Sequence, residues 1–439
     1  MFRVSAFGYI ASLLFVCFGI APPADAGDPS TKVDAAADAL EDKVIGWRRD
    51  IHQNPELGNR ETRTAALVAD HLRALGFDSV RTGIAHTGVV GVLKGARAGP
   101  VVALRADMDA LPVTEETGLA FASTVRTTYN GRDVGVMHAC GHDTHVAMLM
   151  GAAELLAGMR DEIPGTIVFI FQPAEEGPPE DEDGGASLMV AEGALTDPRP
   201  DAIFGLHISP RDLNSLYYAR GPMHASADVL KIKVIGRQTH GAAPHRGIDP
   251  IVVAAQIIIG LQTIHSRQID TRKTAVISIG SIHGGVRNNI IPEEVELIGT
   301  VRTHDAEVRT DVHARIERTA TAIAESAGAR AEVSWGHGIP VSYNEPALVD
   351  RMLPTLERVA GAAMVELTPA VMGYEDFAFF EQQVPGMFVF LGARLPGISR
   401  AEAAPNQSPR FVIDESALRL GVRTYAALAL DFLALSPTE

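Results

Sequence analysis

The chain has 439 residues, a formal net charge of −16, 46% hydrophobic residues and 21% charged residues. This composition is that of a folded, soluble protein and excludes a largely disordered one, while the length favours two or three domains. The acidic balance, with no run of lysine or arginine, also argues against a nucleic-acid-binding surface.

The first residues have the pattern of a secretory signal peptide. Arg3 supplies a positive charge, residues 11–20 form an apolar stretch too short to span a bilayer, and residues 24–26 read Ala-Asp-Ala, a small-residue cleavage site. We therefore expect a signal peptide over residues 1–26, cleavage after Ala26, and a periplasmic or secreted mature protein with no membrane span. An uncleaved membrane anchor is the alternative.

The part of the chain after residue 26 begins as an α/β domain. Apolar periodicity predicts helices at residues 33–51 and 61–75 and strands at residues 89–93, 101–104, 167–171 and 202–206. Strands that alternate with helices form an open, mostly parallel sheet, and in such sheets ligands collect at the carboxyl ends of the strands. We assign residues 27–222 and 338–439 to this larger domain.

A second pattern begins near residue 227. It predicts strands at residues 230–234, 275–282, 294–302 and 331–335, a helix capped by Asp249, and a second helix that begins at Asp305. The order βαββαβ is the ferredoxin-like arrangement. We therefore expect an inserted ferredoxin-like domain over residues 223–337.

The octapeptide His138–His145 (HACGHDTH) combines three imidazoles, a thiol and a carboxylate. In an extended segment the side chains of Cys140 and His142 point to the same side and can bind one ion, and a helix then begins near Asp143 as its N-cap. Thiolate and imidazole suit zinc, with cobalt, manganese or nickel as options where carboxylates join them. The alternative is a loop with a buried free cysteine and surface histidines.

The cysteine count supports the metal interpretation. Cleavage of the signal peptide would remove Cys17 and leave Cys140 as the single thiol of the mature protein. One cysteine cannot form an internal disulfide, and an exposed free thiol is a liability in an oxidising compartment. Metal binding would protect it.

Carboxylates and an imidazole follow the predicted buried strands. These residues are Asp107, Asp109, Glu175, Glu176 and His207. We interpret Cys140, His142, Glu176 and His207 as metal ligands. Glu175 can face the other way, as the unligated carboxylate that takes a proton from a metal-activated water. A pair of glutamates on an ordinary surface loop is the alternative.

Motifs in a fixed order extend over nearly the whole chain after residue 26. They are WRRDIHQNPELGNRET, ALRADMDALPVTEE, MHACGHDTH, FIFQPAEE, GLHISP, THGAAPHRGIDPI, VRNNIIPE, GTVRT and GYEDFAFF. With them the chain resembles the metal-dependent amidohydrolase and carboxypeptidase family that includes the aminoacylases, in particular its hippurate hydrolases and indole-acetyl-amino-acid hydrolases. The resemblance implies a metallopeptidase-type catalytic α/β domain with two divalent metals, an inserted dimerisation or lid domain, and hydrolysis of the amide of N-acyl amino acids.

The resemblance also implies roles for single residues. Cys140, His142, Glu176 and His207 correspond to the metal ligands, Glu175 to the general base, and Asp107 and Asp109 to residues that support the ligands. His240 resembles an imidazole that reaches a neighbouring subunit's active site and steadies the oxyanion. Asn289 and Arg302 are the candidates for binding the substrate carboxylate, because the planar guanidinium suits carboxylate geometry.

One motif departs from the family pattern. The family usually has a late metal-binding histidine in an H-S-P-x-F segment, whereas this chain has Gln407 followed by Ser-Pro-Arg-Phe, and its last histidine is His337. A glutamine carbonyl is neutral and is a weaker ligand than imidazole for a zinc-like ion. We therefore hypothesise that the second metal site is weakened and that activity is reduced, altered in metal preference or lost.

The leading hypothesis is an exported, homodimeric metallo-amidohydrolase that acts on N-acyl amino acids or small peptides. A catalytically weak binding protein with an impaired second metal site is the alternative from another class, and a small-peptide carboxypeptidase or dipeptidase is a third hypothesis. An endopeptidase fits less well, because the expected carboxylate-binding residues, Asn289 and Arg302, favour substrates that end in a carboxylate at this position. The acyl group remains open among acetyl, benzoyl, indole-acetyl and peptidyl groups.

Overall fold

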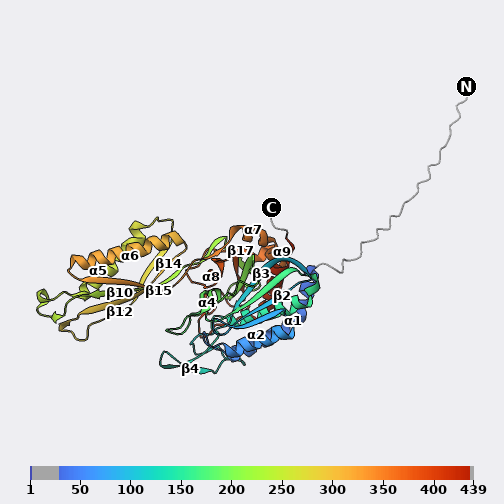
Figure 1. Ribbon diagram of the computed structural model, residues 1–439, viewed down its shortest axis with the longest axis horizontal. Helices are drawn as coiled ribbons and strands as arrows, with labels where there is room; N and C mark the ends of the chain where they lie inside the picture. The colour runs from blue at the N-terminus through green and yellow to red at the C-terminus, as the bar shows by residue number, and fades with distance from the viewer. Residues whose placement is uncertain (2–28, 436–439) are drawn as a thin grey trace.

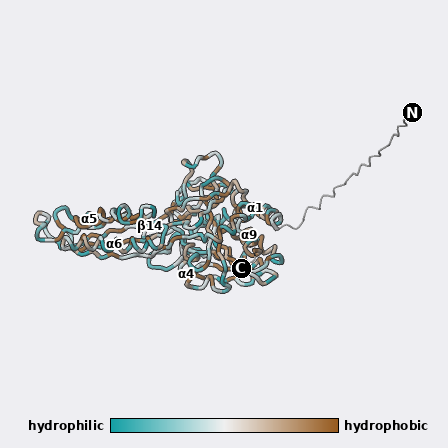
Figure 2. Tube along the Cα trace, turned by 90° about the horizontal axis from the view of Figure 1, so that it is seen from above, coloured by the Kyte–Doolittle hydropathy of each residue, from teal (hydrophilic) through white to brown (hydrophobic). Residues whose placement is uncertain are grey.

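The computed structural model describes Met1 and residues 29–435, so the expected signal peptide lies outside the described residues apart from Met1. A larger domain carries an elongated second domain that extends away from it (Figure 1), and the view from above gives the same elongated outline (Figure 2). Within residues 29–435, no helix is long and apolar enough to cross a membrane.

The larger domain is built on an eight-stranded sheet. In spatial order its strands are β1 (Ser79–Ile84), β2 (Gly88–Lys94), β6 (Pro164–Gln172), β3 (Arg97–Asp107), β7 (Ala202–Ser209), β18 (Gly386–Gly392), β8 (Leu216–Tyr218) and β17 (Val365–Leu367). The central strands β6, β3, β7 and β18 run parallel, whereas β2 and β8 pair with them in the antiparallel sense. This confirms the predicted mostly parallel α/β sheet.

Helices cover both faces of the sheet, which explains why its strands are apolar without alternation. In β6, Ile167 and Phe169 belong to one buried cluster and Val168 and Ile170 to the other. The first cluster includes α1 (Pro29–Gln53), α2 (Thr62–Ala74), α3 (His142–Gly158), α7 (Pro346–Ala360) and α9 (Ala417–Ala434). The second includes α4 (Gly185–Ala191) and α8 (Ala378–Glu381).

The beginning of α3 differs from the prediction. Gly141 is the N-cap residue, with φ of 95°, so the segment is not extended and Asp143 lies inside the helix. The Asp143 carboxylate makes no cap hydrogen bond and is buried instead between Arg48 Nε at 2.8 Å and His52 Nδ1 at 2.9 Å. A Cβ at residue 141 would also approach Ile208 Cγ2 to 2.4 Å, so this turn requires glycine.

The inserted domain has the predicted βαββαβ order. Its elements are β10 (Ala227–Ile235), α5 (Pro250–Thr263), β12 (Ala275–Gly284), β14 (Glu294–Thr303), α6 (Ala306–Ser326) and β15 (Arg330–Ile339). The four strands pair antiparallel in the order β12-β14-β10-β15 and share a core with α5 and α6. Asp249 and Asp305 cap the two helices, each accepting a backbone hydrogen bond of 2.9 Å. The exact boundaries at residues 223 and 337 stay a prediction.

Short strand pairs complete the chain. The hairpin of β4 (Arg126–Tyr129) and β5 (Arg132–Gly135) lies between β3 and α3 in the sequence. In the inserted domain, β11 (Thr239–His240) pairs with β13 (Ile290–Ile291). Where the chain enters and leaves that domain, β9 (Gly221–His224) pairs with β16 (Ser342–Asn344).

Candidate metal centre and active site

The carboxyl edge of the large sheet collects most of the residues that the sequence singled out. Asp107 ends β3 and Asp109 follows it, Glu175 and Glu176 follow β6, and His207 lies near the end of β7. Cys140 and His142 reach this edge from the start of α3. Ligand atoms of Cys140, His142 and His207 lie within 4.8 Å of one another, and so do those of His142, Glu175 and Glu176. Since His142 belongs to both groups, the two candidate metal positions are adjacent.

Each of the two histidines in this cluster has one ring nitrogen available to bind a metal. His142 Nδ1 lies 3.1 Å from Asp109 Oδ1, and His207 Nδ1 donates to the carbonyl oxygen of Ile208 at 2.7 Å. His142 Nε2 is buried without a hydrogen-bond partner among the described residues, and His207 Nε2 lies 3.5 Å from Cys140 Sγ. An imidazole anchored through one ring nitrogen and presenting the other is the usual geometry of a metal ligand.

Asp107 and Asp109 hold the groups around the cluster. Asp107 Oδ1 accepts a hydrogen bond of 2.5 Å from His145 Nδ1, while His145 Nε2 accepts one of 2.8 Å from the backbone of Ile208. Both nitrogens of His145 are therefore engaged inside the protein. Asp109 binds His142 and also accepts a hydrogen bond of 2.9 Å from the backbone N–H of Glu176, so one carboxylate positions two candidate ligands.

The cluster is short of positive charge. Burial, followed by the neighbouring glutamate carboxylates, raises the pKa of the Cys140 thiol well above its ordinary value. Burial and then Glu375 likewise raise the pKa of Glu175. Burial opposes such a shift at His142, but Asp107 and other carboxylates still raise the pKa of that imidazole to about 10. A divalent cation would remove this repulsion and displace the protons from thiol and imidazole.

Sequence reasoning gave no role to a buried charge network beneath the site. The guanidinium of Arg105, 1% exposed, contacts Asp107 at 2.8 Å, Glu375 at 2.9 Å and Asp376 at 3.1 Å. Carboxylate oxygens of Glu175, Glu375 and Asp376 lie within 4.8 Å of one another. The signal was present in the motif GYEDFAFF, where two acids stand among aromatic residues.

Gln407 lies at the cluster, as the sequence motif required. Its backbone has φ of 69° and donates a hydrogen bond of 2.7 Å to the carbonyl oxygen of Ala139. Its side-chain Nε2 donates to the carboxylate of Glu176 at 2.9 Å. The amide therefore occupies a carboxylate oxygen of Glu176, a candidate metal ligand. A histidine at this position would instead offer a ring nitrogen to the metal.

The residues expected from the inserted domain lie on β11, just before β13 and on β14. His240 and Asn289 are both exposed, and they lie together because the N–H of Gly241 donates to the carbonyl oxygen of Asn289 at 2.8 Å. Arg302, at the end of β14, stacks over the ring of Tyr374 at 5.1 Å from its centroid. Tyr374 precedes Glu375, so Arg302 faces the larger domain next to the site.

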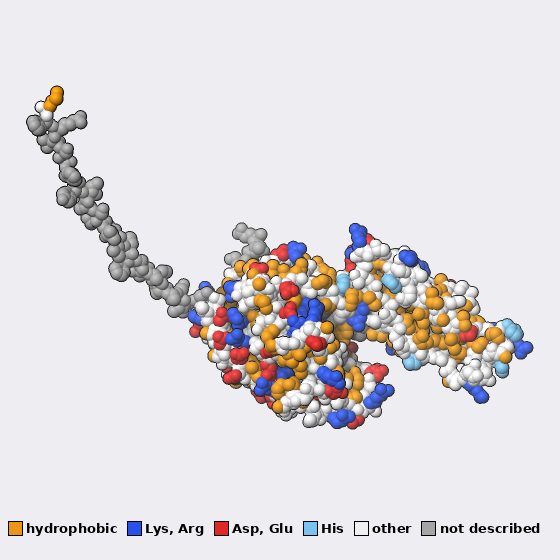
Figure 3. All heavy atoms as spheres, turned by 180° about the vertical axis from the view of Figure 1, so that it is seen from behind, with side chains coloured by type: hydrophobic (Ala, Val, Ile, Leu, Met, Phe, Trp, Pro, Cys, Tyr) orange, Lys and Arg blue, Asp and Glu red, His pale blue; other side chains and the backbone are white. Residues whose placement is uncertain are grey.

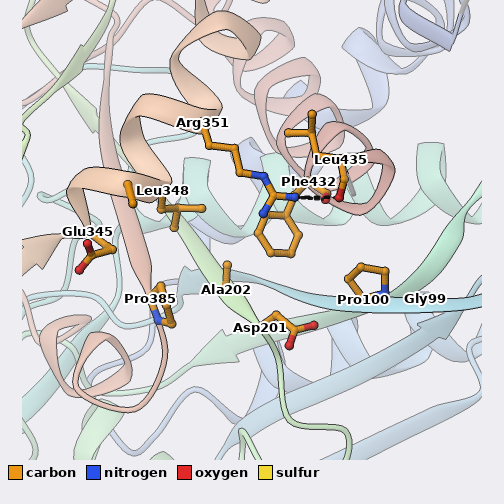
Figure 4. A pocket seen from close by; sticks show the side chains of 11 residues that line it. Gly99, Pro100, Asp201, Ala202, Glu345, Leu348, Arg351, Pro385, Phe432 and Leu435 are labelled. Atoms are coloured by element: carbon orange, nitrogen blue, oxygen red, sulfur yellow. Dashed lines mark hydrogen bonds between the residues drawn. The ribbon is translucent and has the colours of Figure 1, made fainter. Parts of the chain in front are cut away.

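A different cavity, of about 720 Å³, lies at the amino end of the same sheet (Figure 4). Gly99, Ala202 and Pro385 form its strand side, and Leu348 and Arg351 of α7 lie opposite. Arg351 Nη2 donates to the carbonyl oxygens of Phe432 and Leu435, each at 3.0 Å. No candidate metal ligand lines this cavity, so the chemistry lies at the other end of the strands.

The donor set at the carboxyl edge fits a divalent metal centre. It combines a thiol, two imidazoles and carboxylates, and it contains a buried His142 nitrogen that lacks any other partner among the described residues. Thiolate, imidazole and carboxylate are the ligands of zinc and of related first-row metals.

Known proteins are similar to this chain in sequence and in fold. Residues 103–431 match the family model described as Peptidase family M20/M25/M40. Thermostable carboxypeptidase 2 of Saccharolobus solfataricus is 43% identical over 396 residues, which cover 90% of this chain and 96% of that protein. N-acetyl-L-cysteine deacetylase of Bacillus subtilis is 37% identical over 380 residues, covering 86% and 85%.

A solved structure of the same family is also similar to this chain. A Bacillus subtilis protein described as a dinuclear metal binding peptidase from the M20 family has a TM-score of 0.76 and 35% identity, covering 90% of this chain and 99% of that one. The fold, the donor set at the strand ends and these relatives agree. The chain therefore belongs to the peptidase family M20/M25/M40 and is a metal-dependent amidohydrolase.

Proposed function

We propose that this protein hydrolyses the amide bond of N-acyl amino acids with Glu175 as the general base. Cys140, His142, Glu176 and His207 would hold divalent ions, which when bound polarise a carbonyl and lower the pKa of water. The observation that carries the proposal is the position of Glu175. It is 6% exposed, its Oε2 lies 3.8 Å from His142 Nε2, and it is the chain neighbour of the candidate ligand Glu176.

Glu175 has the surroundings of a proton acceptor. Burial and then the Glu375 carboxylate raise its pKa, which makes the ionised form a stronger base than an exposed glutamate. In the proposed reaction Glu175 takes a proton from the attacking water and returns it to the amine nitrogen as the C–N bond breaks. Arg105 keeps Glu375 in place beneath it.

The inserted domain would recognise the amino-acid end of the substrate. Arg302 faces the larger domain over Tyr374, and a guanidinium suits a carboxylate. Asn289 would assist Arg302, and His240 of a neighbouring subunit would steady the oxyanion. The exposure of His240 and Asn289 supports a role toward a ligand or a second subunit.

A homodimer through the inserted domain is part of this proposal. Ile251, Val252 and Ile259 on α5 are 47%, 54% and 70% exposed, and Ile282 on the edge strand β12 is 58% exposed. Hydrophobic side chains also gather on the face of this domain seen in Figure 3. Apolar patches of this kind mark association surfaces. We expect the Ile259→Lys variant to shift the protein toward monomer in sedimentation velocity; a wild-type chain from residue 27 that is monomeric at micromolar concentration would contradict the dimer.

A carboxypeptidase acting on small peptides is the second candidate function. Its support is the 43% identical relative named as a carboxypeptidase, since the same carboxylate-binding pair would serve a peptide's free C-terminus. Comparing hippurate with a dipeptide that has the same C-terminal glycine separates the two activities.

Export remains a proposal as well. The pattern of residues 1–26 supports a periplasmic or secreted location. The expected N-terminus of the exported protein is Gly27, and N-terminal sequencing of protein recovered from the periplasmic fraction would test it.

The central experiment measures metal content per chain and hydrolysis on one sample. Elemental analysis gives the number of ions, and hippurate and N-acetyl-methionine serve as substrates. We expect turnover once zinc, manganese or cobalt is supplied. A fully metal-loaded protein that hydrolyses no N-acyl amino acid would contradict the proposed function.

A further inference from the structure

A cavity of about 360 Å³ opens beside the metal-binding edge. Its lining comes from four stretches of the larger domain, namely residues 57, 58 and 60, residues 109–112, residues 127–130, and residues 176, 177 and 179. Asp109 and Glu176 are among these residues, so the cavity reaches the candidate metal centre. The inserted domain contributes none of the lining.

The cavity and the proposed carboxylate-binding residues lie on different domains. Arg302 belongs to the inserted domain, whereas the cavity lies wholly within the larger domain. A substrate whose scissile amide is at the metal centre has two ends that leave in different directions. If its carboxylate goes to Arg302, its acyl group enters the cavity.

The charges of the side chains that line the cavity also favour an acyl group there over the substrate carboxylate. Apart from Asp109 and Glu176, whose charge bound metal ions would offset, the lining holds one charged side chain. The one cation of the lining, Arg60, donates from Nη1 to Glu182 at 3.0 Å, so its charge is already paired. The cavity therefore favours a neutral group.

The rest of the lining combines apolar side chains and one aromatic ring with the uncharged polar residues Thr127, Thr128 and Asn130. Leu57, Leu111 and Pro112 form part of it, and Tyr129 adds a half-buried phenol ring from the hairpin. A volume of about 360 Å³ falls within the range of small-molecule pockets, about 300–1,000 Å³. An acetyl group would place a single methyl in this space and leave most of it to water.

The hairpin supplies one wall of the cavity. β4 and β5 pair in the register Thr127↔Val134 and Tyr129↔Arg132, and the hairpin projects from the body of the larger domain (Figure 1). Thr127 and Tyr129 are two apart on β4, so their side chains point to the same face. Both are half-buried, whereas Thr128 and Asn130, which also line the cavity, are exposed.

We propose that the β4–β5 hairpin forms the wall of the acyl subsite and sets the enzyme's specificity for bulky, neutral acyl groups, aromatic ones above all, over acetyl. This inference rests on the proposed N-acyl amino acid hydrolysis. It names the substrate class of that site and makes Thr127 and Tyr129 specificity-determining residues.

The test compares N-benzoyl and N-acetyl derivatives of one amino acid, methionine, on the metal-loaded full-length enzyme. Wild type should prefer the benzoyl substrate in kcat/KM. The variant Thr127→Trp should fill the cavity and lower kcat/KM for the benzoyl substrate by about tenfold or more, with the acetyl substrate changed by about twofold at most. The control Asp133→Trp places the same ring on the same hairpin outside the cavity lining, on the other face from Thr127 and Tyr129, and should change neither value.

A second variant guards against a folding defect. Tyr129→Ala removes the aromatic wall without adding bulk and should reduce the benzoyl preference by about threefold to tenfold, with metal content unchanged. Equal losses for both substrates in Thr127→Trp, or an unchanged preference in both variants, would overturn the inference while leaving amide hydrolysis intact. Failure of wild type to hydrolyse either substrate would overturn the proposed function itself, and this inference with it.

Discussion

The two ends of the central sheet differ although the same strands form both. At the carboxyl end, buried carboxylates, imidazoles and the Cys140 thiol gather around His142. At the amino end, the larger cavity of about 720 Å³ is lined mainly by apolar residues, together with Asp201, Glu345 and Arg351, whose guanidinium binds backbone carbonyls. The side chains at and after the carboxyl ends of the strands therefore determine which end of the sheet can be catalytic. The size of a cavity does not.

The largest difference in kcat should be between variants of two glutamates, one at each end of the sheet. Glu175→Gln at the carboxyl end should lower kcat by about 10²- to 10⁴-fold with metal content unchanged, because it removes the proton acceptor only. The matched variant Glu345→Gln, in the lining of the amino-end cavity, should leave kcat unchanged. Loss of metal together with activity in Glu175→Gln would instead make Glu175 a ligand.

Stability should depend on pH through a buried imidazole near the carboxyl end. Burial lowers the pKa of His52, but Asp143 and Glu115 outweigh it and raise this pKa to about 9. The protonated ring therefore stabilises the fold fully below its ordinary pKa of about 6.5, and this contribution is lost as pH rises through about 9.

The variant His52→Gln isolates that contribution. It should lower the free energy of unfolding at pH 6 by roughly 2–3 kcal/mol more than at pH 10. Urea unfolding of both proteins at the two pH values measures the difference. An equal loss at both values would show that the charge of His52 adds nothing.

The departure at Gln407 predicts a smaller effect. Gln407→His should hold the second ion about tenfold more tightly, because imidazole replaces an amide that now donates to Glu176. Metal titration after dialysis, with hydrolysis on the same samples, measures it. Two tightly held ions in wild type, with occupancy and rate unchanged in Gln407→His, would refute the weakened site.

The smallest effect is expected at the amino end. Arg351→Ala should lower the free energy of unfolding by about 1 kcal/mol, because its hydrogen bonds to two backbone carbonyls are lost. The ratio kcat/KM should stay within about twofold of wild type if this end has no part in catalysis. A larger loss of activity would mean that the two ends are coupled.

The sequence predicted the central strands and their carboxyl-end residues well, because an unbroken apolar run that ends in acids is typical of a buried parallel strand leading to a ligand site. Asp249 was correctly predicted as an N-cap from an equally local signal, since it stands just before a helix that needs a cap, and Asp305 caps the second helix at the residue where that helix was expected to begin. Asp143 has the same residue type and position, but burial beside Arg48 and His52 determines its role, and that contact depends on tertiary structure.

The unpredicted parts depend on long-range contacts. Arg105 reads as one polar residue in a strand, and its partners Glu375 and Asp376 lie 270 and 271 residues further along the chain. The hairpin wall also escaped prediction, because Thr127 and Tyr129 form a short strand whose significance comes from the cavity beside it.

The pairing of β9 with β16 has a mechanical consequence. The chain enters and leaves the inserted domain through two paired antiparallel strands, with Asn344 opposite Gly221, and not through two separate linkers. Two paired strands bend together at low cost, whereas twisting them apart breaks their hydrogen bonds. Opening of the site should therefore be a rotation about one hinge, in which Arg302 leaves Tyr374 and returns to the same position on closing.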